Sequence, residues 1–377
     1  MRLERHPLGR GGPTLRAWDA ADGYALEHLE GDVAYAAGTR VLVANDAFGA
    51  LTIGILAGRP RRALPPLTTW LDSHLDEVGL RANLARNGLA ETDLEVVHAT
   101  DSPGGMFDAV VLKVTRDLAT IEDQLHRLRP NISAETVVLG AGMVKHVHTS
   151  TLELFERIIG PTTTSLARRK ARLVHATVDP QRDPGPSPFP VRFITDDGLT
   201  VVSHAGVFSS RRLDHGTRVL LDALAADDAM PPGAHVVDLG CGNGVVGVTI
   251  AGWRPDVTVT FVDDSHAAVA SSRATWAVNH ADRPSTFLVG DCLDPVADAS
   301  ADAVIVNPPF HAQAAMTRDV ALQMIADARR ALRPDGQLVV VGNRHLNHHT
   351  TMRRAFGNVA VIHSTPKFVV LRSVVPN

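Results

Sequence analysis

The sequence predicts an α/β protein made of two consecutive domains, each built around a mostly parallel sheet. Two observations lead to this expectation. Short apolar runs of strand length alternate with amphipathic stretches of helix length along most of the chain, a pattern typical of parallel sheets covered by helices. In addition, the second half of the chain repeats the pattern of the first half, which indicates a duplicated domain.

The expected strands form two series on either side of a proline-rich segment. The first series comprises 40–44, 94–98, 109–113 and 136–139, and the second comprises 235–239, 258–262, 303–306 and 337–341. Between them, DPQRDPGPSPFP (179–190) carries five prolines and little apolar residue, which predicts an extended linker. We therefore expect a first domain at 1–178, a linker at 179–190 and a second domain at 191–377.

Composition limits the kind of protein. The 377 residues are 45% apolar and 21% charged, which suffices for two hydrophobic cores. The net charge of −4 means that any nucleic acid is held by local basic patches. Cys241 and Cys292 are the only cysteines, which excludes a disulfide scaffold or a cysteine-based zinc site and suits a reducing compartment. With no apolar run of membrane-spanning length and no signal peptide, we expect a cytoplasmic protein, favour a monomer and expect no membrane partner.

Three matches support the duplication. GTRVLVANDAFGAL (38–51) aligns without a gap with GAHVVDLGCGNGVV (233–246), Asp108 of FDAVVLKV matches Asp302 of ADAVIVNP, and Leu-Arg-Pro recurs at 128–130 and 332–334. Each match alone is weak, because all α/β units share such patterns. Together they occur in order at offsets of 195, 194 and 204 residues. We infer that one domain was copied.

The copies differ at their polar positions. The second has an acid at 238 and glycines at 240 and 242, where the first has Val, Asn and Ala. The second has Asn-Pro at 307–308, where the first has Lys-Val. The first copy therefore keeps the strands but loses the residues that carry chemistry. We expect it to be an inactive copy that serves in binding or in structural support.

The segment VVDLGCGNG (236–244) predicts a strand that ends on Asp238, a tight turn and a helix. Glycines let the backbone approach a ligand closely, and the free N–H groups of a helix start favour an anion. Such a turn alone also suits a dinucleotide. The acid before it can receive an amine, which suits S-adenosylmethionine, whose methionyl part carries an amine and a carboxylate. The expected cofactor contacts here are Asp238, Gly240, Cys241, Gly242 and Gly244.

Further acids follow the next two strands. Asp263 and Asp264 come about 20 residues after the turn, where a carboxylate accepts ribose hydroxyls. Asp263 directly follows the apolar run, whereas Asp264 could instead cap the next helix. This feature fits NAD and S-adenosylmethionine equally. Asp291 and Cys292 in VGDCL are expected near the adenine, with an ordinary turn acid as the alternative.

The strand 303–306 stops abruptly at NPPFH (307–311). Proline cannot continue a sheet ladder, and the carboxyl ends of parallel strands line the binding crevice. The Asn307 side-chain oxygen and the Pro308 carbonyl can both accept from an exocyclic amine, Pro309 stiffens the turn, and Phe310 can stack on a flat base. Two acceptors at one nitrogen would orient it toward a methyl group without a general base.

Together these motifs resemble class I S-adenosylmethionine-dependent methyltransferases that act on planar nitrogens. GVFSSRRLDHGTRVLL (206–221), VGNRHL (341–346), KFVVLRSV (367–374) and the segment 148–174 narrow the resemblance to two-domain bacterial ribosomal RNA guanine-N2 methyltransferases, the large-subunit 23S branch more closely than the 16S branch. The resemblance implies a catalytic second Rossmann-like domain and a degenerate first one. It also places Phe208, Asp214 and Thr217 beside the cofactor and substrate.

Basic residues mark where RNA could bind, although a solvated surface is the usual role of such clusters. The candidates are Arg168, Arg169, Lys170, Arg172, Arg211, Arg212 and Arg344. The histidines lack accompanying acids or cysteines at ligand spacing, so we expect no metal.

Five alternatives remain open. Within the methyltransferases, the chain could act on 16S rRNA, on adenine N6 or on a protein glutamine. Outside them, it could be an RNA-binding ribosome assembly factor, or a dinucleotide-dependent dehydrogenase, which would leave the NPP turn without a role.

Overall fold

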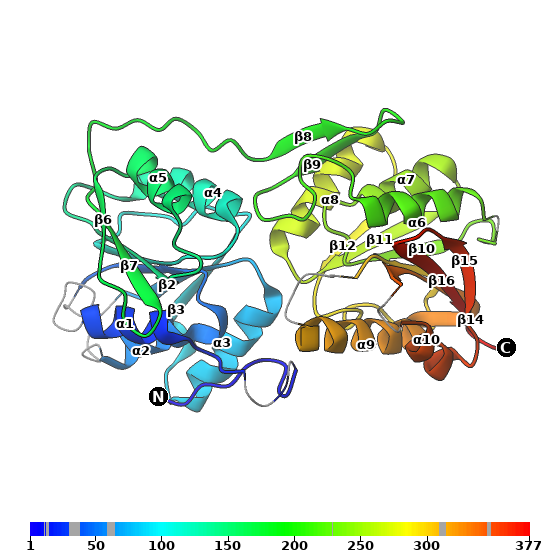
Figure 1. Cartoon of the computed structure of the whole chain (residues 1–377), viewed down its shortest axis with the longest axis horizontal. Coiled ribbons are helices and arrows are strands. Elements are labelled where there is room, and N and C mark those ends of the chain that lie inside the picture. Colours follow the sequence, from blue (N-terminus) through cyan, green and yellow to red (C-terminus); the bar gives the residue numbers. More distant parts are fainter. Residues whose placement is uncertain are drawn as a thin grey trace. The chain divides into compact units, whose positions relative to one another are not determined.

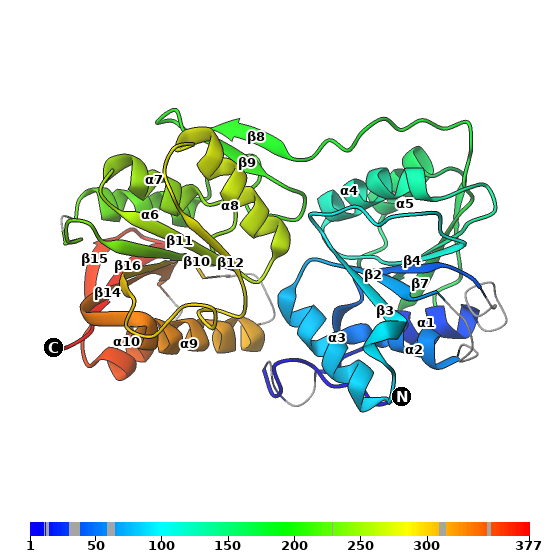
Figure 2. The same cartoon turned by 180° about the vertical axis from the view of Figure 1, so that it is seen from behind.

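The computed structural model describes residues 1–10, 12, 15–29, 38–58, 65–227, 229–308, 314–344 and 348–377, with side chains placed from 318 onward in the segment that begins at 314. The chain divides into two compact units. The first comprises Met1–Gly9 and Thr14–Phe189, and the second comprises Arg10–Pro13 and Pro190–Asn377. Each unit contains a seven-stranded sheet with helices on both faces (Figures 1 and 2).

The first unit follows the expected alternation of strands and helices. Its elements are α1 (Ala20–Leu29), β1 (Val41–Ala44), α2 (Ala50–Gly58), β2 (Leu67–Leu71), α3 (His74–Arg86), β3 (Leu94–His98), β4 (Ala109–Lys113), α4 (Leu118–Leu128), β5 (Val137–Met143), α5 (Thr149–Ile158), β6 (Thr162–Thr164) and β7 (Ala171–Ala176).

The second unit begins with a small hairpin and then repeats the same alternation. Its elements are β8 (Val191–Ile194), β9 (Thr200–Ser203), α6 (His215–Ala225), β10 (His235–Leu239), α7 (Val245–Trp253), β11 (Thr258–Asp263), α8 (His266–Asn279), β12 (Thr286–Val289), β13 (Ala301–Val306), α9 (Ala314–Ala331), β14 (Leu332–Asn343), α10 (His348–Phe356), β15 (Ala360–Ser364) and β16 (Phe368–Val374).

The two sheets have the same topology. The strand order is β3-β2-β1-β4-β5-β7-β6 in the first and β12-β11-β10-β13-β14-β16-β15 in the second. In both, the first five strands along the chain are parallel, and the seventh runs antiparallel between the fifth and the sixth. The α/β fold with two Rossmann-like domains is therefore confirmed.

Each sheet buries both faces, which explains why its central strands are apolar throughout. In the second unit, the consecutive β10 residues Val236 and Val237 point to opposite faces and belong to different core clusters. The first of these clusters includes residues of α6 and α7, and the second includes residues of α9 and α10. Figure 1 shows these helix groups on opposite faces of the sheet.

A shared hydrogen bond fixes the start of the central strand in each copy. Asp108 accepts from the backbone N–H of Arg40 at 2.8 Å, and Asp302 accepts from that of His235 at 2.7 Å. The residues therefore occupy equivalent positions, as their alignment predicted. This contact explains why an acid remains in the degenerate copy. The Asp108 carboxylate links the start of β4 to the start of β1 by a hydrogen bond.

The proline-rich stretch lies against the first unit. Arg129 donates to the carbonyl of Asp179 at 2.7 Å, and the Ser187 hydroxyl donates to Asp123 of α4 at 2.6 Å.

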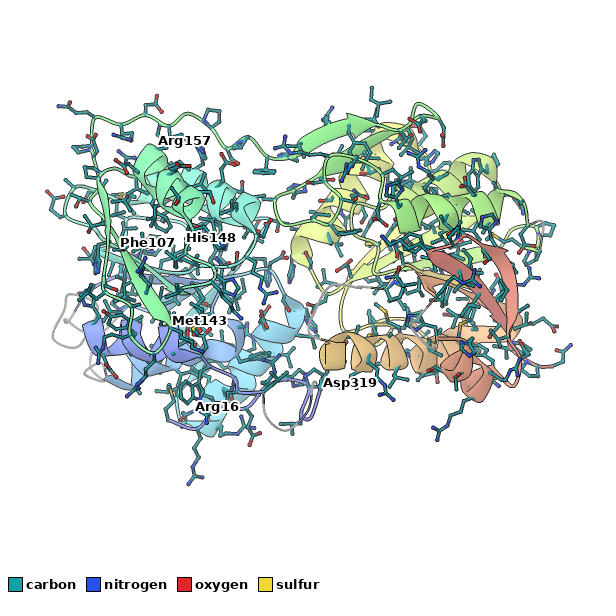
Figure 3. All side chains as sticks on the ribbon, in the orientation of Figure 1. Arg16, Phe107, Met143, His148, Arg157 and Asp319 are labelled. Carbon is teal, nitrogen blue, oxygen red and sulfur yellow. The ribbon has the colours of Figure 1, made fainter. Side chains whose placement is uncertain are left out.

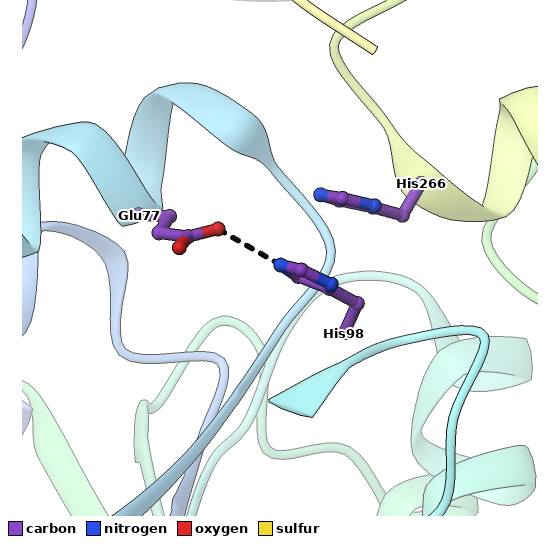
Figure 4. A group of neighbouring side chains, drawn as sticks. All are labelled: Glu77, His98 and His266. Carbon is purple, nitrogen blue, oxygen red and sulfur yellow. Dashed lines mark hydrogen bonds and ion pairs between the residues drawn. The ribbon is translucent and has the colours of Figure 1, made fainter. Parts of the chain in front are cut away.

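An ion pair joins α3 to β3 elsewhere in this unit. Glu77 of α3 pairs with His98 of β3 at 2.9 Å (Figure 4). None of the helices in the described part of the chain has the length and apolar character needed to cross a membrane.

Candidate active site

The site residues of the second unit gather at the carboxyl edge of its parallel strands. Leu239, near the end of β10, pairs with Val262 of β11 and with Val306 of β13. Asp263 pairs with Val289, the last residue of β12. Because these strand ends are in register, the turn after β10 and the residues after β11, β12 and β13 open on one edge of the sheet.

The glycine turn has the tight geometry that its sequence predicts. Gly240, Gly242 and Gly244 have φ values of 69°, 53° and 76°, a region that side chains other than glycine rarely adopt. The N–H groups of Gly240 and Cys241 donate to the carbonyl of Val262 at 2.8 and 3.1 Å, which fastens the turn to β11. A Cβ at Gly242 would meet nothing within 4 Å, so the backbone there borders open space.

Two acids accept hydrogen bonds from backbone N–H groups of the glycine turn and the helix that follows it. Asp238 is buried and accepts from the N–H of Gly247 at 2.9 Å, inside the first turns of α7. Its burial raises the pKa of the carboxyl to about 7, although the hydrogen bond from Gly247 opposes the shift. Asp263 accepts from Gly242 at 3.0 Å and from Ser265 at 3.0 Å. Two acids thus adjoin the glycine turn, and the pKa of the buried one, Asp238, keeps it partly protonated near neutral pH.

The N-cap of α8 is Ser265, two residues after Asp263. Ser265 caps α8, because its hydroxyl accepts from the N–H of Ala268 at 3.0 Å. The alternative assignment of this cap to Asp264 is therefore wrong. A serine is as good an N-cap as an aspartate, so the sequence offered two adjacent candidates and only the backbone geometry distinguished them.

Asp291 is buried and already has partners. It forms an ion pair with Arg10 at 2.8 Å, and Gln323 of α9 donates to it at 3.2 Å. Arg10 belongs to the second unit, although it lies 281 residues before Asp291. Cys292, next to it, is buried with a φ of 49°. No local pattern in the sequence indicates the contact with Arg10.

The Asn307 amide is held by α6. Its Nδ2 donates to the Oγ1 of Thr217 at 2.9 Å. Asp214 caps α6 by accepting from the N–H groups of Gly216 at 2.8 Å and of Thr217 at 3.2 Å. The Oδ1 of Asn307 is buried and has no hydrogen-bond partner among the described residues. A buried acceptor without a partner is costly, so this oxygen is a candidate for a ligand contact.

The remaining predicted positions near this edge lie as follows. Pro308 is buried, whereas the predictions for Pro309 and Phe310 fall outside the described residues. Phe208 is 55% exposed, a large apolar ring on the surface of the loop before α6. The sequence reasoning missed Asn243, which is buried and donates to the Ser203 hydroxyl at 3.3 Å, linking the glycine turn to β9. Its place inside GCGNG could have indicated it.

The basic candidates fall into separate groups. Arg211 and Arg212 are exposed in the loop before α6. Arg344 is exposed and donates to Ser364 at 3.1 Å and to the carbonyl of Thr365 at 3.2 Å, contacts that brace the adjoining β15–β16 hairpin. In the first unit, Arg168, Arg169 and Lys170 are exposed between β6 and β7, and Arg172 is half-buried within β7.

The first unit keeps a positive φ at the first and last positions of the corresponding turn, Asn45 and Gly49, but not at Ala47, and it pairs its polar groups internally. Asn45, which replaces the first glycine, also has a positive φ of 62°, which asparagine tolerates. Its amide exchanges hydrogen bonds with Gln124 at 2.7 and 2.8 Å. Lys113, which replaces Asn307, forms ion pairs with Asp19, at 2.9 Å, and with Asp22 of α1. These contacts satisfy the polar groups internally, so this copy shows no unpaired acceptor corresponding to that of Asn307.

Comparisons with known proteins agree with this division. Residues 1–180 match the RLMG N-terminal domain, and residues 198–372 match the methyltransferase small domain. The chain is 48% identical to ribosomal RNA large subunit methyltransferase G of Streptomyces avermitilis, over 96% of this chain and 93% of that protein. It is 41% identical to the protein of that name from Aeromonas hydrophila, over 99% and 97%.

A solved structure shares the whole architecture. It is a T. thermophilus 16S rRNA N2 methyltransferase in complex with AdoMet and guanosine, superposing with a TM-score of 0.77 at 21% identity over 97% of this chain and 94% of that one. At this identity the likeness shows the fold. The full-length identity to the curated relatives shows more: this chain belongs to the ribosomal RNA large subunit methyltransferase G family, whose cofactor is S-adenosylmethionine.

Proposed function

We propose that this chain transfers the methyl group of S-adenosylmethionine to the exocyclic N2 of a guanosine in 23S rRNA. The observation that carries the proposal is the Oδ1 of Asn307, which is buried at the carboxyl edge of the second sheet and has no hydrogen-bond partner among the described residues. The Oγ1 of Thr217 accepts a hydrogen bond from the Asn307 Nδ2, so the Asn307 Oδ1 points away from Thr217. The family assignment supports rRNA as the substrate, and the acceptor geometry supports an amine as the group methylated.

The residues around the glycine turn fit the cofactor. The backbone at Gly242 borders open space, so the methionyl part can approach it closely. Asp238 offers a buried carboxylate to the amine, and Asp263 offers oxygens to the ribose hydroxyls while also holding the turn. When bound, the cofactor supplies an electrophilic methyl group on a sulfonium, which is released as a neutral thioether.

Asn307 and Pro308 position the nucleophile. The Oδ1 of Asn307 and the carbonyl of Pro308 accept the two hydrogens of the base amine, which fixes its plane and aims its nitrogen at the methyl group. Guanine N2 is a weak nucleophile because its lone pair is delocalised into the ring. Orientation and the two negative dipoles lower the barrier by stabilising the positive charge that develops on nitrogen. The proton lost after transfer goes to water.

The other residues have supporting roles in this proposal. Pro309 stiffens the turn, and Phe310 stacks on the base. Phe208 covers the site from the exposed loop before α6, while Cys241, Asp264, Asp291 and Cys292 complete the cofactor surroundings. Arg211, Arg212 and Arg344 contact RNA near the catalytic domain. The first unit binds RNA or supports the catalytic domain and has no catalytic role of its own.

Nucleoside analysis tests the proposal directly. Large-subunit rRNA transcribed without modifications is incubated with the purified chain and methyl-labelled S-adenosylmethionine, then digested and separated by mass spectrometry. We expect label in N2-methylguanosine. Two parallel incubations replace this RNA with unmodified small-subunit rRNA or with ribosomal proteins freed of RNA. Label in N6-methyladenosine, or label in the proteins alone, would overturn the proposed substrate atom. Label on small-subunit rRNA but not on large-subunit rRNA would overturn the proposed RNA.

A further inference from the structure

The connection between β6 and β7 in the first unit forms a surface tip. The five residues Leu166–Lys170, here called the hairpin tip, are all exposed, and Leu166 is 87% exposed. It joins the antiparallel strands at the carboxyl edge of the first sheet, because Ala171 at the start of β7 pairs with Met143 at the end of β5. Met143 is labelled in Figure 3.

The turn at this tip has an unusual sequence. Arg168 and Ala171 exchange both backbone hydrogen bonds, at 2.9 and 2.8 Å, so that only Arg169 and Lys170 lie in the loop. Their φ values are 49° and 63°. A two-residue loop with positive φ at both positions is a type I′ turn, which strongly prefers Asn-Gly. Side chains other than those of glycine, asparagine and aspartate are disfavoured in this conformation.

A bulge turns Leu166 outward. Three residues lie between Thr164 and Arg168 on the first strand, whereas two lie between Ala171 and Val174 on the second. The first strand therefore contains one extra residue, which disrupts the ladder and redirects side chains. Leu166 lies in this bulge. An almost fully exposed leucine beside two cations is a feature that the fold itself does not require.

Arg168 anchors the tip to α1. It pairs with Glu27 at 3.0 Å and lies over the ring of Tyr24 at 4.9 Å, and the Tyr24 hydroxyl donates to the carbonyl of Leu166 at 3.3 Å. In contrast, the side chains of Arg169 and Lys170 make no hydrogen bond or ion pair with any described residue. The tip is thus held in place, and none of the described residues neutralises the charges of Arg169 and Lys170.

Further cations surround the tip. The N–H of Val144 donates to the carbonyl of Lys170 at 2.8 Å, so the loop after β5 adjoins the turn. Lys145 is exposed in that loop, and Arg116 is exposed after β4. Partial burial, followed by the charges of Arg116 and Lys145, lowers the pKa of His146. Basic side chains therefore lie next to the hairpin tip, although the net charge of the chain is −4.

We propose that the hairpin tip is an RNA-contacting element of the degenerate domain, in which Arg169 and Lys170 bind phosphate oxygens and Leu166 packs on an unstacked base or ribose. The inference rests on the proposed rRNA substrate. Cations and a bulge also protect an edge strand from pairing with other chains, but an Asn-Gly turn beside Arg168 would close the hairpin with less strain. Positive φ values at two cations that have no partner among the described residues favour a bound anion as the reason for the strain.

The experiment exchanges the strained turn for the preferred one. The double variant Arg169→Asn/Lys170→Gly should unfold at a temperature about 2–4 °C higher, because the positive φ positions are relieved. Its affinity for protein-free large-subunit rRNA should fall on the order of 10-fold at 0.1 M salt, and the slope of log affinity against log salt should shrink by about 2. S-adenosylmethionine affinity should stay unchanged.

Two further variants sharpen the result. Arg353→Gln/Arg354→Gln removes two adjacent exposed charges from the end of α10 and is expected to keep the wild-type affinity. An equal loss in this variant would show that net charge, not the tip, carries the binding. Leu166→Ser should weaken binding without changing the salt slope, since its contact is apolar.

Other results would overturn the inference. If the wild-type chain binds and methylates rRNA but the turn variant does so equally well, the tip has no such role and the proposed function stands. If the variant loses only activity on assembled subunits and still binds protein-free rRNA normally, the tip contacts a ribosomal protein instead. A wild-type chain that binds no rRNA would overturn the proposed function together with the inference.

Discussion

The Nδ2 of Asn307 donates a hydrogen bond to the Oγ1 of Thr217 at 2.9 Å, across 90 residues of sequence. This contact turns the nitrogen of the Asn307 amide toward Thr217, and Oδ1 has no hydrogen-bond partner in the described part of the chain. Besides its predicted place beside the cofactor, Thr217 therefore has a second role, as the residue that positions the acceptor.

Thr217→Val tests this positioning role. Valine keeps the shape of threonine but cannot accept from Nδ2, so the Asn307 amide loses its fixed orientation. We expect kcat to fall on the order of 10- to 100-fold, with little change in cofactor affinity measured by calorimetry. Thr217→Ser restores the acceptor and should recover most of the activity. Equal losses in both variants would indicate that only the packing of α6 matters.

Asn307→Ala removes the proposed acceptor itself. Methyl transfer should fall by about 100-fold or more, measured as single-turnover rates with saturating cofactor. The dissociation constant of S-adenosylmethionine should stay close to that of the wild-type chain, because Asp238 and the glycine turn remain. A parallel loss of cofactor affinity and rate would mean that Asn307 belongs to the cofactor site.

Asp238→Asn tests the buried carboxyl through its pH dependence. Burial raises the pKa to about 7 in the folded chain, above the ordinary value of about 3.9 for an unfolded chain. Between these values the folded state holds the extra proton, so this group makes unfolding easier as pH rises from about 4 to 7. The variant should therefore be more stable than wild type at pH 8, by on the order of 1–4 kcal/mol.

Cofactor binding should show the opposite trend. An amine ligand favours the ionised carboxylate, so wild-type affinity should rise between pH 5.5 and 7.5, and binding should release a proton. In Asp238→Asn, the affinity should be low and nearly independent of pH over this range. Asp282→Asn, which removes an exposed acid, is the matched control. Calorimetry in buffers of different ionisation enthalpy measures the proton release.

Gly244→Ala and Gly242→Ala separate two reasons for glycine in the turn. A Cβ at Gly244 would lie 2.7 Å from Cβ of Ser272, in addition to the strain of a φ of 76°. A Cβ at Gly242 meets nothing within 4 Å. Gly244→Ala should therefore lower the unfolding temperature clearly more than Gly242→Ala, whose cost is mainly backbone strain of about 1–2 kcal/mol.

Gly242→Ala should instead affect the ligand. Its new methyl group would occupy the open space where the methionyl part is expected, so cofactor affinity should fall although the fold persists. Thermal unfolding and calorimetry on the two variants check both effects. If both variants fold correctly and lose cofactor affinity to a similar extent, Gly242 is not the position that faces the ligand.

The strands illustrate what local pattern can predict. The ranges 94–98, 109–113 and 235–239 agree with the ends of β3, β4 and β10, because apolar runs bounded by turn residues define strands locally. β14 instead spans Leu332–Asn343, longer than the expected 337–341. Its first residue pairs with Ala301 ahead of a register shift, and such pairing depends on the neighbouring strand.

The sequence by itself determined the doubled α/β architecture, the glycine turn and the polar residues at the strand ends, since periodicity and turn chemistry act over a few neighbouring residues. Only the tertiary structure decided which atoms those residues leave free. Thr217 orients the Asn307 amide, and Arg10 forms an ion pair with Asp291. The turn at 169–170 adopts a backbone conformation that arginine and lysine disfavour. Hydrogen-bond partners and backbone strain are settled through space, by groups that lie far apart in the chain.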